Sequence, residues 1–493
     1  MIFSHPRRAA ALFLLCLPLL GVAACTVNPA TGEKSFTAFM SPQEEIRIGR
    51  EEHGKAIRQF GGSYGEKDLE AYVKRIGESL HRVSEMPDLA FTFTLLNTDM
   101  VNAFALPGGF VYVTRGIMAL AENEAELAGI LAHEIGHGTA RHSAQRYSQA
   151  VAANLGLTVF SIGAQVLGLP GQLGDVAAQG AGLYLMAYSR DQELEADMLA
   201  VRYMSHVGYD PNALVTFFEK LEAHSTLESR MTGRNDADRN DAMATHPRTS
   251  ERIRQAIELA QAATVAHPRI ERDPYLDRID GLLFGDDPSQ GAIRGRTFLH
   301  PDLKIQFTVP QGFTLLNGPR QVVARHANGA LILFDMVRDG RSPGDHLVNV
   351  WGKGLTIRNV ERLDVNGLDA ATGTTRATPR GGGGARDIRL VALRGPDGAI
   401  HRLMFATPTD LTAALSQDLQ RTTYSVRALS DAEAGAIRPL RLRVVRLTGA
   451  NQVDGLIRSM PFEAYSRPWF EVLNGLAPGQ PPLPGNRVKV VGD

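Results

Sequence analysis

The spacing of apolar residues changes from helical to alternating near residue 290. Before that point apolar residues recur every three to four positions, as in the stretch 41–60, where Ser41 and Pro42 are typical of a helix start. After it, short segments alternate between apolar and polar residues, separated by Gly- and Pro-rich turns. The pattern predicts an α+β protein that is mostly helical first and β-rich in its middle.

A small sheet and a long helix are predicted within the first part of the chain. Residues 89–96 alternate as a strand, and residues 102–116 indicate two short strands about the Gly108–Gly109 turn. Asn123 is typical of a helix N-cap, with Glu126 three residues later as its capping-box partner. The helix that follows has a buried stripe formed by Leu127, Ile130, Leu131 and Ile135.

The segment 151–170, VAANLGLTVFSIGAQVLGLP, carries no charged residue. Its length is that of a membrane-spanning helix, but Asn154, Ser161, Gln165 and several glycines make it a poor one. We expect a buried helical hairpin or a lid over a cleft. Contact with a membrane is the alternative.

Composition and charge exclude one class of partner. Of the 493 residues, 44% are hydrophobic and 21% charged, as in soluble globular proteins, and the length suggests about three domains. The formal net charge is -1, and no Lys/Arg block gives a basic surface. Nucleic acid is therefore not expected as a partner.

The first 25 residues have the pattern of an export signal. Arg7 and Arg8 precede an apolar run of secretory-signal length that ends in VAAC at Cys25. This resembles the lipobox of bacterial lipoproteins, which implies acylation of Cys25 and a lipid anchor to the membrane; ordinary signal cleavage beside an incidental cysteine is the alternative. By resemblance to envelope lipoproteins that lack Asp after the cysteine, Thr26 implies an outer-membrane lipoprotein that faces the periplasm of the cell envelope. Both cysteines of the chain lie in this leader, so no internal disulfide is expected.

The stretch HEIGH places His133 and His137 four residues apart, with Glu134 between them. On a helix these histidines share one face and can hold one metal ion, and Glu134 can act as the base that takes a proton from a water molecule. Alone, the motif is only a moderate signal in a chain with 14 histidines.

A hydrolytic zinc site needs a third protein ligand, and the stretch RDQELEAD at 190–197 supplies a candidate. Glu193 and Asp197 are four residues apart, so one helix face presents both carboxylates. We expect Glu193 to bind the metal and Asp197 to orient a ligand histidine through its free N–H. Glu195 projects from nearly the opposite face and is expected to be solvated.

Four blocks of sequence together resemble the gluzincin zinc peptidases of the HtpX, Oma and prenyl-protein-protease kind, which include periplasmic BepA-like chaperone-proteases. The blocks are NAFALPGG at 102–109, HEIGHGTARH at 133–142, RDQELEAD at 190–197 and THP at 245–247. The resemblance covers roughly residues 40–265. It implies one Zn²⁺ per chain, a mostly helical zincin-type metalloprotease domain with a small edge sheet, Glu193 as third ligand, and a substrate-binding edge strand that contains Asn102, Ala103 and Phe104.

The same resemblance gives His246 a role near the zinc. This histidine either stabilises the oxyanion formed during catalysis or occupies the open metal position in a resting state. Arg190 is expected to pair with Asp197 or with the substrate. His142 lies about 140° around the helix from His137, so it is not expected to be a ligand.

The last 50 residues follow the order strand, helix, helix, strand. The stretches VVRLTGANQVDGLIRSM, VLNGL and LPGNRVKVV resemble a divergent LysM module, the peptidoglycan-binding βααβ fold. The opening GANQV departs from the usual glycine-aspartate-threonine of such modules, so peptidoglycan binding and a scaffold role stay equally open.

The sequence predicts four regions: a lipoprotein signal peptide at 1–25, a zinc metalloprotease domain at 26–285, a β-rich domain of unknown role at 290–435 and a LysM-like module at 438–493. The expected function is a periplasmic zinc endopeptidase that uses zinc-activated water and a Glu base on misfolded or misassembled envelope proteins. Alternatives are a peptidoglycan-associated chaperone or scaffold with a latent zinc site, and a peptidoglycan-cleaving metallopeptidase.

Overall fold

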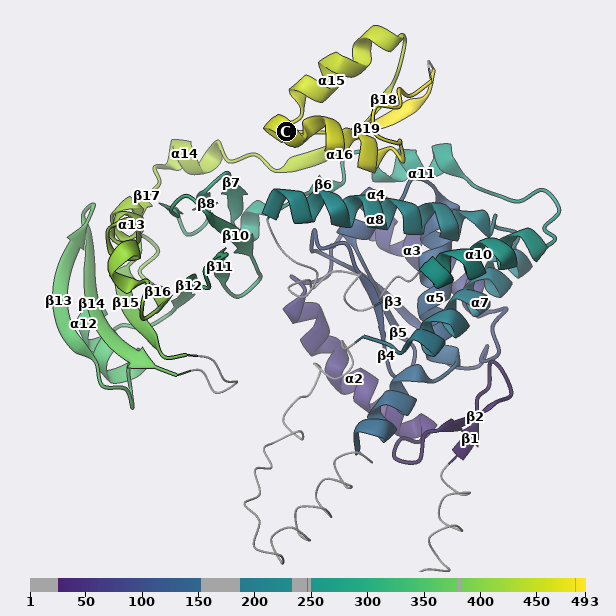
Figure 1. Ribbon diagram of the computed structural model, residues 1–493, viewed down its shortest axis with the longest axis horizontal. Coiled ribbons are helices and arrows are strands. Elements are labelled where there is room, and N and C mark those ends of the chain that lie inside the picture. Colours follow the sequence, from purple (N-terminus) through teal and green to yellow (C-terminus); the bar gives the residue numbers. More distant parts are fainter. Residues whose placement is uncertain (1–24, 152–186, 233–245, 247–249, 379–383, 484) are drawn as a thin grey trace, which may run out of the picture.

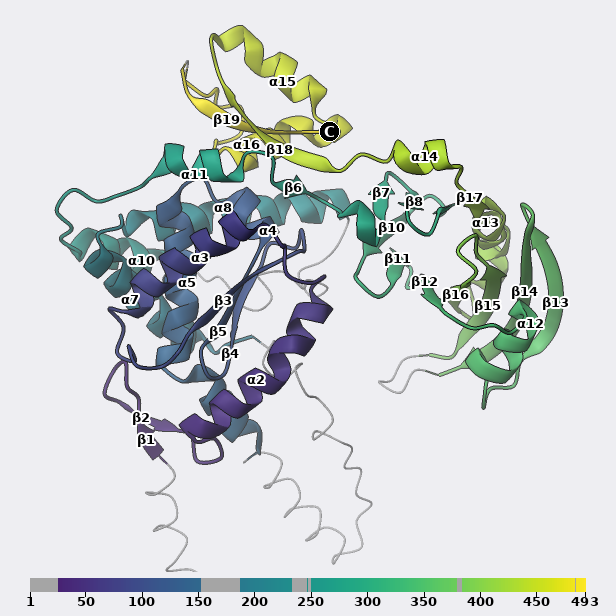
Figure 2. The same ribbon diagram turned by 180° about the vertical axis from the view of Figure 1, so that it is seen from behind.

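The computed structural model describes residues 25–151, 187–232, 246, 250–378, 384–483 and 485–493. The first and last parts of the chain form one lobe, and the strand-rich middle forms a second lobe beside it (Figures 1 and 2). The predicted signal peptide before Cys25 and nearly all of the uncharged segment 151–170 lie outside the described residues. Within the described ranges, no helix combines the length and the apolarity that crossing a bilayer requires.

Helices make up most of the first lobe. The cap predicted at Ser41 is present, because its hydroxyl accepts the N–H of Glu44, and Gly61 and Gly62 end this helix with positive φ of 83° and 93°. The helices are α2 (Pro42–Gln59), α3 (Lys67–His81), α4 (Arg115–Leu120), α5 (Glu124–Thr139), α7 (Arg190–Val207), α8 (Asn212–Thr232), α10 (Ser250–Ala262) and α11 (Arg272–Ile279).

Helix α5 is buried on nearly all of its faces and lies at the centre of the first lobe. The Asn123 side chain accepts the N–H of Glu126, as predicted. The capping box was wrong, however, because the Glu126 carboxylate does not return to Asn123. It accepts instead from the Glu122 N–H, from Thr216 and from the Lys220 ammonium at 2.5 Å. A buried cation on α8 therefore outcompetes the local cap.

A three-stranded sheet lies beside α5. Its strands are β3 (Thr92–Leu96), β4 (Ala103–Leu106) and β5 (Phe110–Thr114), in the order β3-β5-β4, with β3 parallel and β4 antiparallel to β5. The β4–β5 hairpin predicted about Gly108 is confirmed; a Cβ atom there would lie 2.6 Å from the Ile46 Cα atom, so the turn packs tightly on α2. Strand β4 forms one edge of this sheet. A separate short hairpin joins β1 (Cys25–Val27) and β2 (Lys34–Phe36).

The middle lobe is built around a seven-stranded antiparallel sheet in the order β10-β11-β12-β16-β15-β14-β13. It has its own hydrophobic core, which includes Phe307, Phe334 and Val391. The large-sheet strands are β10 (Phe313–Asn317), β11 (Val322–His326), β12 (Leu331–Val337), β13 (Arg358–Val365), β14 (Leu368–Ala377), β15 (Arg386–Arg394) and β16 (Ile400–Pro408). A four-stranded sheet adds β7 (Ala292–Arg294), β8 (Thr297–His300), β9 (Ile305–Thr308) and β17 (Arg427–Ala428), and α13 (Thr412–Ser425) packs beside it.

The C-terminal unit has the predicted order of strand, helix, helix and strand. Its elements are β18 (Leu440–Arg446), α15 (Val453–Ser459), α16 (Ser466–Leu473) and β19 (Arg487–Gly492), and α14 (Asp431–Gly435) precedes it. Strand β18 pairs with β19 and also with β6 (Leu283–Phe284) of the first lobe. Its apolar residues belong to the same hydrophobic cluster as those of α5 and α8. The boundary near residue 438 therefore separates segments of sequence but not hydrophobic cores, and a LysM-like identity stays a prediction.

One buried lysine fixes the C-terminal unit to the first lobe. The Lys489 ammonium donates to the carbonyls of Ala119, Leu120 and Ala121 at 2.8, 3.1 and 2.7 Å, where α4 ends. These carbonyls have no partner within the helix, so the lysine acts as a C-cap supplied from 370 residues away in the sequence. Burial lowers the pKa of Lys489 to about 7.

Replacement of Lys489 by Met should lower the free energy of unfolding by about 2 kcal/mol, because buried carbonyls at the end of α4 lose their donor. Urea unfolding followed by tryptophan fluorescence measures this, since Trp469 lies in the C-terminal unit. Arg443→Met on the exposed face of β18 is the matched control. An unchanged or higher stability of Lys489→Met would show that the lysine does not hold the unit in place.

Candidate metal centre and active site

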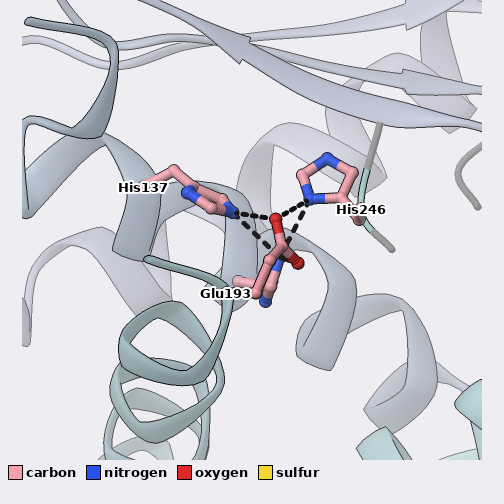
Figure 3. Close-up of side chains that lie close together, drawn as sticks. His137, Glu193 and His246 are labelled. Carbon is pink, nitrogen blue, oxygen red and sulfur yellow. Dashed lines mark hydrogen bonds and ion pairs between the residues drawn. The ribbon is translucent and has the colours of Figure 1, made fainter. Parts of the chain in front are cut away.

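Three segments bring four metal-binding side chains together. His133 and His137 lie one turn apart on α5, Glu193 lies in the first turn of α7, and His246 comes from the segment between α8 and α10. Ser189 starts α7 with a complete capping box, which fixes the position of the first turn. One ligand atom from each residue lies within 4.8 Å of the others, and all four side chains are buried. Figure 3 shows His137, Glu193 and His246 directed toward one another.

The spacing of these atoms fits a zinc ion. His133 Nε2 lies 3.0 Å from His137 Nε2 and 3.3 Å from His246 Nδ1, and Glu193 Oε1 lies 3.4 Å from His137 Nε2. Four atoms placed tetrahedrally about 2.0–2.2 Å from zinc lie roughly 3.3–3.6 Å apart. Three imidazole nitrogens and a carboxylate are also ligands that zinc prefers. The residues that would hold zinc are therefore His133, His137 and Glu193, with His246 in the fourth position.

Glu134 lies beside this cluster without belonging to it. Its Oε1 atom is 3.5 Å from His246 Nε2, while its Oε2 atom is buried and has no hydrogen-bond partner among the residues that the structure describes. Burial raises the pKa of this carboxyl, and the neighbouring imidazoles of His246 and His133 partly oppose that shift. A carboxylate with a free oxygen next to a metal site is suited to accept a proton from water.

Asp197, which the sequence predicts to orient a ligand histidine, lies behind His133. Its Oδ1 atom is 2.9 Å from His133 Nδ1, so the ring can direct Nε2 toward the metal site. Arg252 holds this carboxylate with two contacts, Nε to Oδ2 at 2.7 Å and Nη2 to Oδ1 at 2.8 Å. Burial opposes ionisation of Asp197, but the Arg252 charge outweighs it and holds the pKa of the carboxyl below its usual value.

The predicted substrate strand lies at the edge of its sheet. Strand β4 has β5 on one side, and among the described strands none pairs with its other side. The side chains of Ala103 and Phe104 are 3% exposed, so they anchor the strand. Ala103 also lines a small cavity of about 40 Å³ together with His133, Glu134 and His246. The edge of β4 and the metal cluster therefore border the same space.

Comparison with known proteins agrees with this geometry. Residues 67–260 match peptidase family M48. This matched range, the M48 domain, covers less than half of the chain. The matched range contains α5 and α7, the helices that carry His133, His137 and Glu193. It also contains His246. The family and the buried cluster together support zinc as the metal.

The chain is also similar to several curated proteins. Mitochondrial metalloendopeptidase OMA1 of Schizosaccharomyces pombe is 34% identical over 221 residues, which cover 43% of this chain and 60% of that protein. The beta-barrel assembly-enhancing protease of Yersinia pestis is 30% identical over 234 residues, 45% of each chain. This chain therefore spans about half the length of the curated relatives that it matches. Among solved structures, a cyanobacterial PsbP from Synechocystis aligns with 28% of this chain and 98% of that one at 15% identity, but its TM-score of 0.22 establishes no shared fold.

Arg190 does not pair with Asp197 in the M48 domain. Its side chain is exposed and forms an ion pair with Glu251. Arg190 and Asp197 lie seven residues apart on α7, which is two turns or about 10 Å along the axis, too far for a direct contact. The arginine that pairs with Asp197 is Arg252 of α10, which sequence spacing could not indicate because it lies on a different element. A contact between Arg190 and substrate stays a prediction.

A second chain of contacts lies behind His137 and was not predicted. His142 Nδ1 is 2.8 Å from His137 Nδ1, and its Nε2 atom is 3.3 Å from Glu195 Oε2. Asn28 donates to the other Glu195 oxygen at 2.6 Å. If His137 presents Nε2 to the metal, its Nδ1–H donates to His142, whose Nε2–H donates to Glu195. Glu195 is thus half-buried and engaged, and the expectation of a solvated Glu195 was wrong.

His142 lies outside the four-residue cluster but has a supporting position that one-helix geometry did not reveal. Helix α5 ends at Thr139, and Arg141 has a positive φ of 56°, so the chain turns and brings His142 under His137. The 140° estimate assumed a continuous helix. Tyr188 was also missed: its ring stacks on His137 with centroids 3.7 Å apart, and Arg146 lies over its other face.

Replacement of His142 by Phe should weaken zinc binding of the M48 domain 10–100-fold, because His137 Nδ1 loses its buried acceptor. Competition against a fluorescent zinc chelator measures the affinity. His206→Phe, on an exposed position of α7, controls for the loss of an imidazole elsewhere. Wild-type zinc affinity in the His142 variant would contradict the supporting role.

Proposed function

We propose that the protein is a zinc-dependent endopeptidase that hydrolyses peptide bonds of misfolded or misassembled envelope proteins. The observation that supports this most directly is the convergence of His133, His137 and Glu193 within one buried cluster, with the Glu134 carboxylate beside it. Ala103 of the edge strand β4 lines the same small cavity as His133 and Glu134. The M48 match and the metalloendopeptidase relatives support the same activity.

Each part of the site has a role in this proposal. Zinc, when bound, polarises the scissile carbonyl and lowers the pKa of a water molecule. Glu134 takes the proton of the attacking water at its free Oε2 atom and passes it to the leaving nitrogen. Asp197 and His142 keep the rings of His133 and His137 in the orientation that presents Nε2.

The substrate backbone is proposed to add to the free edge of β4. An extended segment there gains main-chain hydrogen bonds whatever its sequence, which suits clients that have lost their fold. The cavity beside His133 and Glu134 is lined mainly by apolar side chains, including Ile130, Leu214 and Phe217. We therefore expect cleavage next to a small apolar residue.

His246 closes the site in the structure. Its Nδ1 atom lies 2.9 Å from Glu193 Oε1 and 3.3 Å from His133 Nε2, among the ligand atoms (Figure 3). Of the two roles that the family resemblance implies, this placement favours a resting state in which the histidine takes the fourth position. Peptide cleavage then requires His246 to move away, after which it can contact the oxyanion.

Zinc content and peptide cleavage, measured on the same preparations of wild type and His246→Ala, test the proposal. One zinc per chain, with cleavage of an unfolded protein that stops on chelation and returns with zinc, is expected. His246→Ala should cleave faster if the histidine is a latch. One zinc without cleavage in either protein would favour a chaperone or scaffold whose zinc site is latent, and a lack of zinc would eliminate the metal site.

The cellular setting is proposed from the sequence and the relatives. The name of the beta-barrel assembly-enhancing protease connects that relative with barrel assembly, and the lipobox-like Cys25 suggests a periplasm-facing outer-membrane lipoprotein. Misfolded envelope proteins are then the substrates, with the membrane as a partner through the anchor. Peptidoglycan is a further candidate partner, supported only by the strand, helix, helix, strand order of the C-terminal unit.

A further inference from the structure

The middle lobe contains an open cavity of about 630 Å³ that the peptidase chemistry does not use. Its lining residues belong to α13 and to the ends of strands β13 to β16. Figure 1 shows these elements in the second lobe. Cavities that bind small ligands have volumes of about 300–1,000 Å³. The cavity is therefore large enough for a metabolite or a lipid headgroup.

On one face of the sheet, the side chains change from apolar to charged where the face reaches this cavity. On β15, residues 387, 389 and 391 point to the same face because side chains alternate. Val391 and its neighbour Leu403 on β16 are fully buried in the core. One row further, Arg389 lies opposite Phe405, and the row after that contains Asp387. The same face thus passes from an apolar core to a charged wall.

Two of the arginines on this wall have no partner among the described residues. The guanidinium groups of Arg358 on β13 and Arg389 on β15 form no ion pair or hydrogen bond with the residues that the structure describes. Arg376, in contrast, is held by Asp387, whose other oxygen accepts from the Thr412 hydroxyl at 2.8 Å. Three guanidinium groups against one carboxylate leave the cavity wall with a net charge of +2.

The remaining lining is suited to a polar ligand body. Thr412, Ser416 and Gln420 recur every four residues on α13, so their side chains share the helix face that borders the cavity. Thr374 and Thr407 add hydroxyls from the strands. The Phe405 ring supplies an apolar floor between them.

We propose that this cavity is a binding site for a phosphate monoester. Guanidinium groups bind phosphate oxygens in a two-pronged geometry, and two that pair with no residue of the described ranges line this cavity. A phosphate monoester carries a charge of about -1.5 to -2 at pH 7, which matches the charge of the wall, whereas a single carboxylate would neutralise only half of it. The hydroxyls and amides then contact the sugar or glycerol to which the phosphate is attached.

Calorimetric titration of the purified chain tests the site, with glycerol 3-phosphate as the soluble probe and phosphatidylcholine vesicles with and without phosphatidic acid as the membrane probe. Arg389→Gln and Arg358→Gln are the test variants. Arg362→Gln is the matched control, because Arg362 is exposed on the same strand as Arg358 but does not line the cavity. Circular dichroism melting checks that all variants are folded.

The proposal predicts that both test variants bind at least tenfold more weakly than wild type, while Arg362→Gln binds normally. Binding of glycerol 3-phosphate identifies a free metabolite as the source of the phosphate, and binding to phosphatidic acid vesicles alone identifies a lipid headgroup. Absence of binding to both probes would overturn the proposal. Equal binding by folded Arg389→Gln, Arg358→Gln and wild type would overturn it as well, as would tighter binding of acetate than of glycerol 3-phosphate.

Discussion

Replacement of Glu134 by Gln is expected to lower the rate of peptide cleavage by about 10³-fold while zinc stays bound. The amide has nearly the shape of the carboxylate but cannot take a proton from water. Zinc should remain, because Glu134 lies outside the four-atom cluster and only approaches it through His246 at 3.5 Å. The measurement is cleavage of a quenched fluorescent peptide, together with zinc per chain by atomic absorption.

A control variant is needed to distinguish the loss of this particular base from the loss of any one carboxylate. Glu219 lies exposed on α8, and Glu219→Gln should cleave at the wild-type rate. A Glu134→Gln protein that holds one zinc and keeps more than a tenth of the activity would show that another group is the base. Loss of zinc in this variant would instead mean that Glu134 supports the metal cluster.

Spacing along the sequence was sufficient to predict which residues share one face of the same helix or strand. Residues His133, His137, Glu193 and Asp197 are each four apart in pairs, so helix geometry alone indicated which face they share. The β4–β5 hairpin followed from alternation and the Gly108–Gly109 pair in the same way. Within each of these pairs, and within the hairpin, the residues are close in sequence. Their relative positions therefore follow from local geometry without tertiary information.

The supporting contacts could not be predicted because they join elements that are far apart in sequence. Arg252 reaches Asp197 across 55 residues, Asn28 reaches Glu195 across 167, and Lys489 reaches Ala119 across 370. The turn at Arg141 that places His142 under His137 depends on an unfavourable positive φ, which residue preference argues against. Strand β13 is exposed at nearly every position, and β14 buries a run of four small residues, 370–373. Neither strand therefore shows the alternation by which a half-buried strand is recognised in a sequence.

Loss of Arg252 should strongly destabilise the metal-free protein. Arg252 is 1% exposed, and it contacts both the Asp197 carboxylate and, at 2.6 Å through Nη1, Glu193 Oε2. Arg252→Met preserves much of the side-chain volume but leaves two buried carboxylates without their cation. Removal of one partner from a buried ion pair costs about 3–5 kcal/mol. The free energy of unfolding, measured with urea in the presence of a chelator, should fall by that amount.

Two dependences distinguish this electrostatic cause from a loss of packing. Zinc should restore more stability to Arg252→Met than to wild type, because its charge lies next to Glu193 and replaces part of the missing cation. The second dependence concerns pH. In wild type the pKa of Asp197 is held below its usual 3.8, so this group adds stability above that pH and loses it as the pH falls. The deficit of the variant should therefore be largest at neutral pH and shrink on acidification.

Arg254→Met is the matched control, since Arg254 is exposed on the same helix and its loss should change the unfolding free energy by less than about 0.5 kcal/mol. A deficit of Arg252→Met that is the same at all pH values and with or without zinc would assign the effect to packing against Phe218, over whose ring the guanidinium lies at 5.0 Å. A deficit that follows pH and zinc would mean that Arg252 balances the negative charge of the carboxylates before the metal binds. The metal-free fold would then depend on a cation that the sequence places on α10, outside both blocks that carry the ligands.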